Sequence, residues 1–345
     1  METVLITGGA GFFGDILKSS LLERGYKVVS IDLEKDEAQH PNLVTIQGDI
    51  RNAKLLDTLF TEHSFVAVFH LAAILAHAVK DKNFLWSCNV DGTREVASAM
   101  KRHNVRKVVY TSTNCLWGAP MGRPVKEEDA PHPIEIYGKS KLEGEDILLA
   151  CAPDIVPVII RCPTIMDAGR LGLLAILFEF IDEGRIVWVV GGGDNRYQFI
   201  YAHDLVDACV RSLSLTEPVV LNIGSDNVKS FREVYDHVIR KAGTKSRVGT
   251  LPKGLTLFAM RVAYKLGLSP LGPYQYKMIA EDFEFDTTRI RRVLDWKPTL
   301  TNEQMLYEAY EHYHTHRKDI ENRTNVSAHK QAAKMGIIRL LKWFS

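Results

Sequence analysis

The chain lacks any marked excess of charge of either sign, and this limits the partners it could bind. Among its 345 residues, 43 lysines and arginines stand against 42 aspartates and glutamates, which gives a formal net charge of +1 at pH 7. Proteins that bind nucleic acid usually carry a clear basic excess. We therefore expect no nucleic-acid partner.

Cysteine is scarce as well: the chain has only 5, scattered and without the spacing of metal ligands. This predicts a reduced, cytoplasmic protein without a metal site. The first residues do not combine a basic segment with an apolar one, so we expect no secretory signal. Repeats and low-complexity segments are also absent, and the 46% of hydrophobic residues is typical of soluble globular proteins.

The most informative stretch is a glycine-rich turn near the start of the chain. A short apolar run at 4–6 predicts a buried strand, and helical spacing begins at about residue 15. Gly8, Gly11 and Gly14 lie between the two. A glycine turn between a strand and a helix lets phosphates approach the backbone, and the helix start adds free N–H groups. This pattern predicts a cradle for the phosphates of a nucleotide, although a merely tight turn would look the same.

An acidic residue supports the nucleotide interpretation. Asp32 ends the second predicted strand, at 27–32, where a carboxylate can accept hydrogen bonds from both hydroxyls of an adenosine ribose. The same carboxylate would repel a 2′-phosphate, and Leu33 and Glu34 follow it instead of an arginine. We therefore expect the cofactor NAD in preference to NADP.

Strands and helices alternate through the first half of the chain. Strands are predicted at 27–32, 43–46, 66–73, 107–112 and 156–161, with helices at 14–24, 52–62, 85–103 and 137–151. This alternation predicts an α/β protein, a Rossmann-type doubly wound parallel sheet with a smaller, mostly helical C-terminal substrate lobe. The predicted NAD-binding domain is 1–165, rejoined by 199–223; the lobe is 166–198 and 224–318, and 319–345 is a linker with an amphipathic tail.

Three side chains have the chemistry of proton transfer. Tyr137 and Lys141 share one face of a predicted helix, because residues four apart in a helix lie together. A nearby cation favours the phenolate, which can act as a base on a hydroxyl. Thr113 stands at the end of a strand, where ligands bind in open α/β sheets. The alternatives are an exposed helix pair and a turn cap.

With these motifs in order, the sequence resembles the extended short-chain dehydrogenase/reductases, in particular NAD-dependent nucleotide-sugar epimerases and dehydratases. The resemblance covers about 2–318 and includes the glycine turn, 48–50, 71–73, Asn89 with Gly92-Thr93, and the Tyr137-to-Lys141 motif. Further motifs lie at 161–163 and 222–224.

The resemblance implies a role for each matching residue. NAD would be bound by Gly8, Gly11, Phe12, Phe13, Gly14, Asp32, Asp49, Ile50, Leu71, Ala72, Ala73, Asn89, Tyr137, Lys141 and Pro163. The catalytic residues would be Thr113, Tyr137 and Lys141, and the substrate would contact Thr113, Thr164 and Arg196. Arg196 is offset by one position from the family's diphosphate-binding arginine. The resemblance also implies a homodimer, formed through the helices at 85–103 and 137–151.

Departures from the family pattern narrow the reaction. Sugar dehydratases carry an Asp-Glu pair after the catalytic threonine, whereas this chain has Asn114 and Cys115. The expected activity is an NAD-dependent epimerase of a nucleotide-linked or lipid-diphosphate-linked sugar, through a 4-keto intermediate. The alternatives are a net dehydrogenase of the 3β-hydroxysteroid type and a non-catalytic NAD-binding protein.

Two apolar segments bear on the substrate and on the location of the protein. The segment 255–266 is too short to span a bilayer, so it is either a buried lobe helix or an apolar flap over a lipid-linked or sterol substrate. The tail 334–344 is a basic amphipathic helix candidate. It predicts contact with the inner face of a membrane, with packing on the body of the protein or on a second subunit as alternatives.

Overall fold

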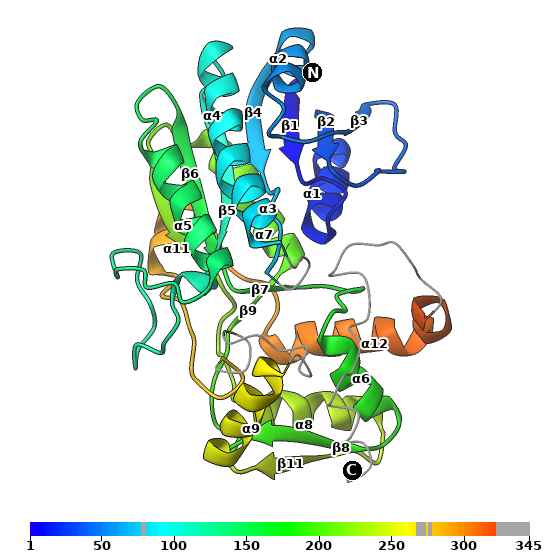
Figure 1. Ribbon diagram of the computed structural model, residues 1–345. Coiled ribbons are helices and arrows are strands. Elements are labelled where there is room, and N and C mark those ends of the chain that lie inside the picture. The colour runs from blue at the N-terminus through cyan, green and yellow to red at the C-terminus, as the bar shows by residue number, and fades with distance from the viewer. Residues whose placement is uncertain (77–80, 267–273, 275–277, 322–345) are drawn as a thin grey trace.

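The computed structural model describes residues 1–76, 81–266, 274 and 278–321. Its centre is a parallel sheet of seven strands in the order β10-β6-β5-β4-β1-β2-β3 (Figure 1). The strands are β1 (Thr3–Thr7), β2 (Lys27–Asp32), β3 (Leu43–Gln47), β4 (Phe65–His70), β5 (Lys107–Thr113), β6 (Val156–Cys162) and β10 (Val219–Asn222). The predicted doubly wound fold is confirmed, with its reversal of strand order between β1 and β4.

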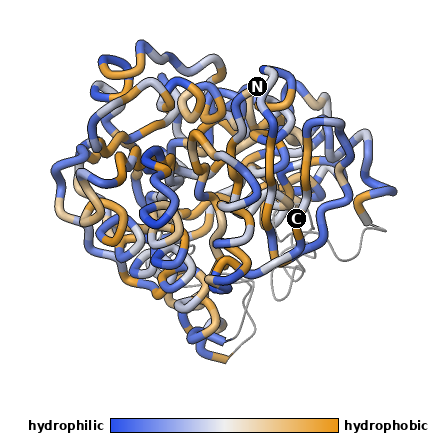
Figure 2. Tube along the Cα trace, turned by 90° about the horizontal axis from the view of Figure 1, so that it is seen from above, coloured by the Kyte–Doolittle hydropathy of each residue, from blue (hydrophilic) through white to orange (hydrophobic). Residues whose placement is uncertain are grey.

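Alternating side chains of β1 explain why helices cover both faces of the sheet. Val4 and Ile6 pack with Leu17 of α1 (Phe12–Glu23) on one face, and Leu5 packs with Leu56 of α2 (Ala53–Glu62) on the other. All five side chains are fully buried. The first face also carries α7 (Ala202–Arg211) and α11 (Thr288–Leu294), and the second α4 (Gly92–Arg102) and α5 (Ile136–Leu149). Figure 2 shows hydrophobic segments in the middle of the molecule.

Two predicted elements differ in detail from the structure. The strand predicted at 66–73 ends at His70, and residues 71–73 form a loop beyond it. The helix predicted at 85–103 is three pieces: α3 (Lys82–Trp86), a π-helical turn (Ser87–Asp91) and α4. A π turn widens the helix locally, and such turns often occur at functional sites. Here it carries Asn89.

The remaining elements form the lobe at the lower end of Figure 1. It contains α6 (Leu174–Asp182), α8 (Phe231–Ala242), α9 (Lys253–Lys265) and α12 (Asn302–Glu321), with β8 (Ile186–Val190) paired to β11 (Arg247–Leu251). β7 (Thr164–Met166) pairs with β9 (Phe199–Tyr201) in a separate two-stranded sheet. Within 199–223, β10 therefore joins the main sheet and β9 does not. Ser230 and Glu233 form a capping box at the start of α8.

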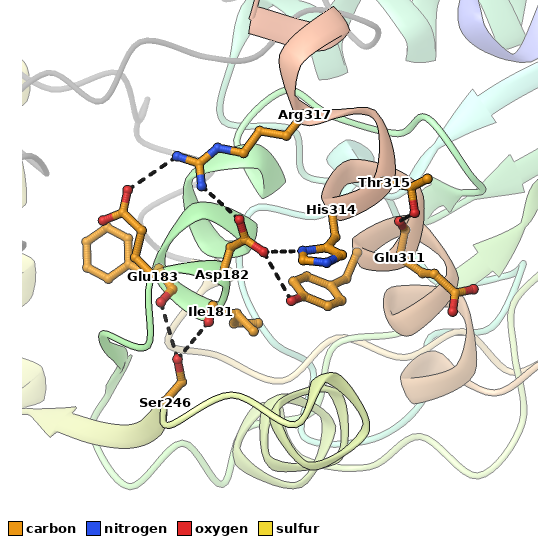
Figure 3. Close-up of polar contacts among 10 residues, drawn as sticks. Ile181, Asp182, Glu183, Ser246, Glu311, His314, Thr315 and Arg317 are labelled. Atoms are coloured by element: carbon orange, nitrogen blue, oxygen red, sulfur yellow. Dashed lines mark hydrogen bonds and ion pairs between the residues drawn. The ribbon is translucent and has the colours of Figure 1, made fainter.

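Polar contacts fasten α12 to α6 (Figure 3). Asp182 at the end of α6 accepts a hydrogen bond from His314, and Arg317 Nη1 lies 2.7 Å from its Oδ2. Arg317 also reaches Glu183, with 3.3 Å between Nη2 and Oε1. Ser246 Oγ donates to the carbonyl of Ile181 at 3.0 Å. The contacts of Asp182 and Glu183 hold α6, which lines the cavity described below, against the last described helix, and Ser246 ties the end of α6 to the segment just before β11.

The segment 255–266 is helical, but it is not the buried helix that its composition suggested. Ala263 is the single buried residue of α9. Leu255 is 68% exposed and Phe258 is 64% exposed. No helix of the described residues is long and apolar enough to cross a membrane. The tail at 334–344 lies outside the described residues.

Candidate active site

One large cavity, of about 1070 Å³, lies at the C-terminal ends of the central strands and extends into the lobe. Most of the side chains expected at the site line it: Gly8, Gly11, Phe12, Phe13, Gly14, Asp32, Asp49, Ile50, Leu71, Ala72, Ala73, Thr113, Tyr137, Lys141, Pro163 and Thr164. Asn89 and Arg196 are not among its lining residues. Residues that are far apart in the sequence therefore meet at one site.

In the glycine turn between β1 and α1, Gly8 and Gly14 have no room for a side chain. A Cβ on Gly14 would lie 2.1 Å from the carbonyl oxygen of Gly8, and Gly8 itself has a φ of +79°. Gly11 precedes the first residue of α1, and no side chain caps the helix start. The first N–H groups of a helix have no partner within the helix, so they are available to an anion.

A buried lysine supports this turn from behind. The side chain of Lys18 is 2% exposed, and its Nζ lies 2.6 Å from Oδ2 of Asp36 and 3.1 Å from Oδ1 of Asp15. It also donates to the carbonyl of Gly9 at 3.4 Å. Sequence reasoning did not single out Lys18, because a lysine in a helix is usually exposed.

Asp32 lies at the end of β2, and two backbone N–H groups fix the orientation of its carboxylate. Its Oδ2 accepts from the N–H of Ala10 at 3.0 Å, and its Oδ1 accepts from the N–H of Glu34 at 3.0 Å. A carboxylate has about four acceptor positions, so both oxygens can still accept from a ligand. Asp49, further along the same wall, is bound by Arg51, whose side-chain hydrogen bond lowers the pKa of Asp49.

A chain of hydrogen bonds joins the ends of β1 and β4 beneath the cavity. Ala72 donates to Thr7 Oγ1 at 3.3 Å, and Thr7 Oγ1 lies 2.6 Å from Nδ1 of His70. On the other side of the ring, Nε2 lies 2.8 Å from Oγ1 of Thr93, which donates to the carbonyl of Asn89 at 2.7 Å. Because the proton of Thr93 is directed to that carbonyl, Thr93 accepts from the ring, which places a proton on Nε2 of His70. Burial lowers the pKa of His70 to about 3.

Asn89 supports the wall of the cavity without lining it. Its Oδ1 accepts from the N–H of Ile74 at 2.7 Å, and its Nδ2 donates to the carbonyl of Ile74 at 3.1 Å and to Ser140 Oγ at 2.9 Å. The π turn thus ties the loop after β4 to the first turns of α5.

Tyr137 and Lys141 lie one turn apart near the start of α5, as expected; the side chain of Lys141 is buried and that of Tyr137 is partly buried. Burial raises the pKa of Tyr137, while a hydrogen bond with Thr113 acts in the opposite direction. Burial also lowers the pKa of Lys141 to about 7. Its Nζ lies 3.8 Å from the ring centroid of Tyr110. The protein alone thus does not make Tyr137 a ready base, and the lowered pKa expected from Lys141 is outweighed by burial.

The residues after Thr113 are held in neutral forms. The amide of Asn114 donates to the hydroxyl of Tyr197 at 2.6 Å. Burial raises the pKa of the Cys115 thiol to about 11. Neither side chain can exchange a proton readily near neutral pH.

Arg170 is a cavity residue that sequence reasoning missed. Its Cζ lies 5.7 Å from the ring centroid of Phe12, and its buried Nε has no hydrogen-bond partner in the described part of the chain. Burial lowers the pKa of Arg170 to about 10. The sequence feature that could have indicated Arg170 as a site residue is its position as a lone arginine directly after Gly169 and ahead of an apolar helix. Arg196, by contrast, lines a separate small cavity with Arg123, Asp282 and other residues.

The lobe end of the cavity is aromatic. The ring of Tyr197 stacks on that of Phe231, with centroids 6.1 Å apart, and Phe231 contacts Tyr235 at 5.5 Å. Trp188 and Tyr274 complete this part of the lining. Flat apolar rings with a few polar groups are typical of sites for organic ligands.

Comparison with known proteins identifies the family. The model of the NAD dependent epimerase/dehydratase family matches residues 4–224. The chain belongs to this family. It is 36% identical over 345 residues to the uncharacterized protein y4nG of Sinorhizobium fredii, in a match that covers 99% of this chain and 86% of that protein. The chain is therefore an NAD-dependent enzyme of the sugar epimerase and dehydratase type.

A further relative agrees with this assignment, and a solved structure shares the fold. The UDP-glucose 4-epimerase of Mycolicibacterium smegmatis is 29% identical over 314 residues, covering 85% of this chain and 93% of that protein. Among solved structures, the UDP-glucose 4-epimerase of Thermotoga maritima with UDP-glucose has a TM-score of 0.75 at 23% identity, covering 92% of this chain and 99% of that one. At this identity the structural match supports the fold.

The residues of this family member fit NAD. The uncapped start of α1 and the glycine turn suit the diphosphate. The carboxylate of Asp32 keeps free acceptor positions for ribose hydroxyls. From there the cavity continues to Tyr137, so one dinucleotide could span the distance.

Proposed function

We propose that this enzyme is an NAD-dependent 4-epimerase of a sugar carried on a diphosphate, with either a nucleotide or a lipid as the carrier. The observation that carries the proposal is a shared cavity. Thr113, Tyr137 and Lys141 line the same space as the glycine turn and Asp32. The M. smegmatis relative, named a UDP-glucose 4-epimerase, supports the choice of reaction.

In the proposed mechanism, Tyr137 removes the proton from the hydroxyl on C4 of the sugar. Thr113, which is hydrogen-bonded to Tyr137, holds the same hydroxyl in position. Bound NAD would supply the hydride chemistry at C4, in both directions. After the 4-keto sugar has turned in the cavity, so that its other face receives the hydride at C4, Tyr137 gives the proton back to the C4 oxygen, and one residue is both base and acid.

Lys141 and Arg170 supply the charge that the reaction needs. Lys141 would bind the ribose hydroxyls next to the nicotinamide, and its ammonium would favour the phenolate of Tyr137. Arg170 acts in the same direction, because its positive charge lowers the pKa of Tyr137. Gly8, Gly11, Phe12, Phe13 and Gly14 would surround the diphosphate of NAD, with Asp32 at the ribose.

The neutral residues after Thr113 favour epimerisation over loss of water. A dehydratase needs an acid and a base beside the catalytic threonine to remove water from C5 and C6. Asn114 is neutral, and the thiol of Cys115 has its pKa raised to about 11. The 4-keto sugar would therefore persist until it is reduced again.

The sterol alternative loses its main support. It rested on the apolar segment at 255–266 acting as a flap over the substrate. Of that segment, Met260 lines the cavity, whereas Leu255 and Phe258 are exposed to solvent. A sterol pocket would need those large side chains inside.

The proposal is tested by incubating the purified full chain with UDP-glucose, UDP-N-acetylglucosamine and a polyprenyl-diphosphate-linked sugar in turn. We expect the 4-epimer of one of them by NMR, with no net gain in NADH absorbance. The Tyr137→Phe variant is the matched control and should give no epimer. Steady accumulation of NADH without epimer would overturn the proposal in favour of a one-way dehydrogenase.

The expected homodimer and the cytoplasmic location belong to the same proposal. α4 and α5 pack side by side on one face of the sheet. In a dimer that forms through four helices, each chain contributes two such neighbouring helices. Sedimentation equilibrium of the full chain should give twice the chain mass of 38.9 kDa; a single chain mass would remove the dimer from the proposal.

A further inference from the structure

The outward side of α9 carries a stripe of large apolar side chains. Leu255, Phe258, Val262 and Leu266 are 68%, 64%, 40% and 66% exposed. Their spacing of three or four residues places them on one face of the helix. Isolated apolar residues on a surface are common, but four in one stripe mark a surface that binds something apolar.

Basic residues lie along the same helix. Arg261 and Lys265 are exposed, and neither forms an ion pair within the described residues. Helical geometry puts both at the side of the apolar stripe. Lys253, at the start of α9, is 3.0 Å from Glu281. Between 253 and 266 there is no acidic residue. The exposed stripe of α9 is thus apolar with a positive border.

The opposite side of α9 belongs to the enzyme. Ala263 is buried, and Met260 lines the lobe end of the cavity. Figure 1 shows α9 at the outer edge of the lobe, at the end of the molecule opposite α2. Whatever covers the exposed stripe of α9 would therefore lie beside the substrate end of the cavity.

We propose that the exposed stripe of α9 docks on the surface of an anionic phospholipid bilayer. An apolar face bordered by lysine and arginine is the pattern of helices that lie in the membrane interface. The apolar side chains would enter the acyl boundary, and Arg261 and Lys265 would reach the lipid phosphates.

Charge disfavours two other occupants of this surface. A second copy of the chain docked by a two-fold axis through α9 would bring its Arg261 and Lys265 close to their counterparts. The tail at 334–344 carries Lys334, Arg339 and Lys342 and no acidic residue. Packed on α9, it would add positive charge to positive charge. An anionic bilayer attracts both segments instead.

The test is co-sedimentation of the full chain with vesicles of phosphatidylcholine, with and without phosphatidylglycerol. We expect binding to the mixed vesicles, weakened by salt. Replacing Leu255 and Phe258 together by serine should weaken binding about tenfold or more, because each buried apolar side chain contributes strongly. Replacing Arg261 and Lys265 together by glutamine should weaken binding to the mixed vesicles about tenfold.

Matched variants separate the exposed stripe of α9 from the tail and from apolar residues elsewhere on the surface. Val66→Ser removes an apolar side chain that is 44% exposed on β4, away from α9, and should leave binding unchanged. Leu340→Ser with Leu341→Ser tests the tail. If the α9 variants bind as tightly as the natural chain while the tail variant does not, the proposal is overturned. It is also overturned if the full chain binds no vesicles, or if the α9 variants change its oligomeric state and not its lipid binding.

Turnover provides an independent readout. None of Leu255, Phe258, Arg261 and Lys265 lines the cavity, so the α9 variants should keep normal epimerase activity on a soluble nucleotide sugar. Loss of that activity together with lipid binding would point to unfolding of the lobe and would overturn the assignment of these residues to docking.

Discussion

The two ends of the cavity are built from different kinds of group. At the glycine turn the lining includes Gly8, Gly11 and Gly14, which present only backbone and are held by short-range geometry between β1 and α1. At the lobe end it is made of rings, such as Trp188, Tyr197 and Tyr274, which come from segments far apart in the chain. At the first end the backbone suits a diphosphate, and Asp32 is the side chain that suits the adjoining ribose. The second end depends on the exact side chains, so that is where specificity for the sugar and its carrier should reside.

The largest expected effect is at the junction of the two ends. Tyr137→Phe removes one oxygen, and we expect kcat/KM to fall about a thousandfold because the acid–base group is lost. Affinity for NAD, measured by calorimetry, should change little. Tyr110→Phe is the matched control, since Tyr110 is buried against Lys141 but does not line the cavity. Equal losses in both variants would show that packing, and not proton transfer, explains the effect.

The next largest effect should be confined to the cofactor end. Gly14→Ala places a Cβ 2.1 Å from the carbonyl oxygen of Gly8, and the backbone must shift to admit it. We expect about a hundredfold weaker NAD binding, because the shifted backbone no longer presents its N–H groups to the diphosphate at hydrogen-bonding distance. Gly254→Ala is the control because its added Cβ meets no atom within 4 Å. Unchanged NAD affinity in Gly14→Ala would break the link between this turn and the cofactor.

The contrast between the two ends also explains what could be predicted from the sequence. The glycine turn, Asp32 and the Tyr137–Lys141 spacing are local patterns, and each is visible within one or two elements. The parallel sheet followed from the same alternation of strands and helices. All of these predictable features depend on short stretches of chain, where backbone geometry allows few solutions.

The missed features depend on contacts between distant segments. Arg170 acquires its place only when the loop before α6 folds over Phe12. Lys18 can be buried because Asp36, in the segment between β2 and β3, pairs with its charge at 2.6 Å between Nζ and Oδ2. Arg196 matched a family position to within one residue, yet its backbone N–H is held by Asp282 and its side chain lines another cavity. The exposure of the outward face of α9 could not be predicted from the sequence, because an apolar helix is usually buried.

A smaller effect should appear at the boundary, in Arg170→Gln. We expect kcat/KM to fall about tenfold, which corresponds to about one pKa unit of lost charge stabilisation at Tyr137. The positive charge of Arg170 lowers the pKa of Tyr137. Its removal raises that pKa, so the acidic limb of the pH–rate profile should move to higher pH. Arg196→Gln, the control outside the main cavity, should leave both kcat/KM and the profile unchanged. A larger loss in Arg196→Gln than in Arg170→Gln would reverse the assignment.

The smallest effect concerns the support of the cofactor end by His70. Its folded-state pKa, about 3, lies below its usual value of 6.5. Between these values the unfolded chain holds one more proton, so stability falls as the pH drops from 6.5 towards 3, by up to about 1.4 kcal/mol per pH unit. His70→Gln removes this titration, while its amide can still accept from Thr7 and donate to Thr93. Urea unfolding at pH 6 and pH 5 should therefore show a shallower pH dependence in the variant. An equal slope in both proteins would mean that His70 is already protonated when folded, and Thr7 could then no longer donate to its Nδ1.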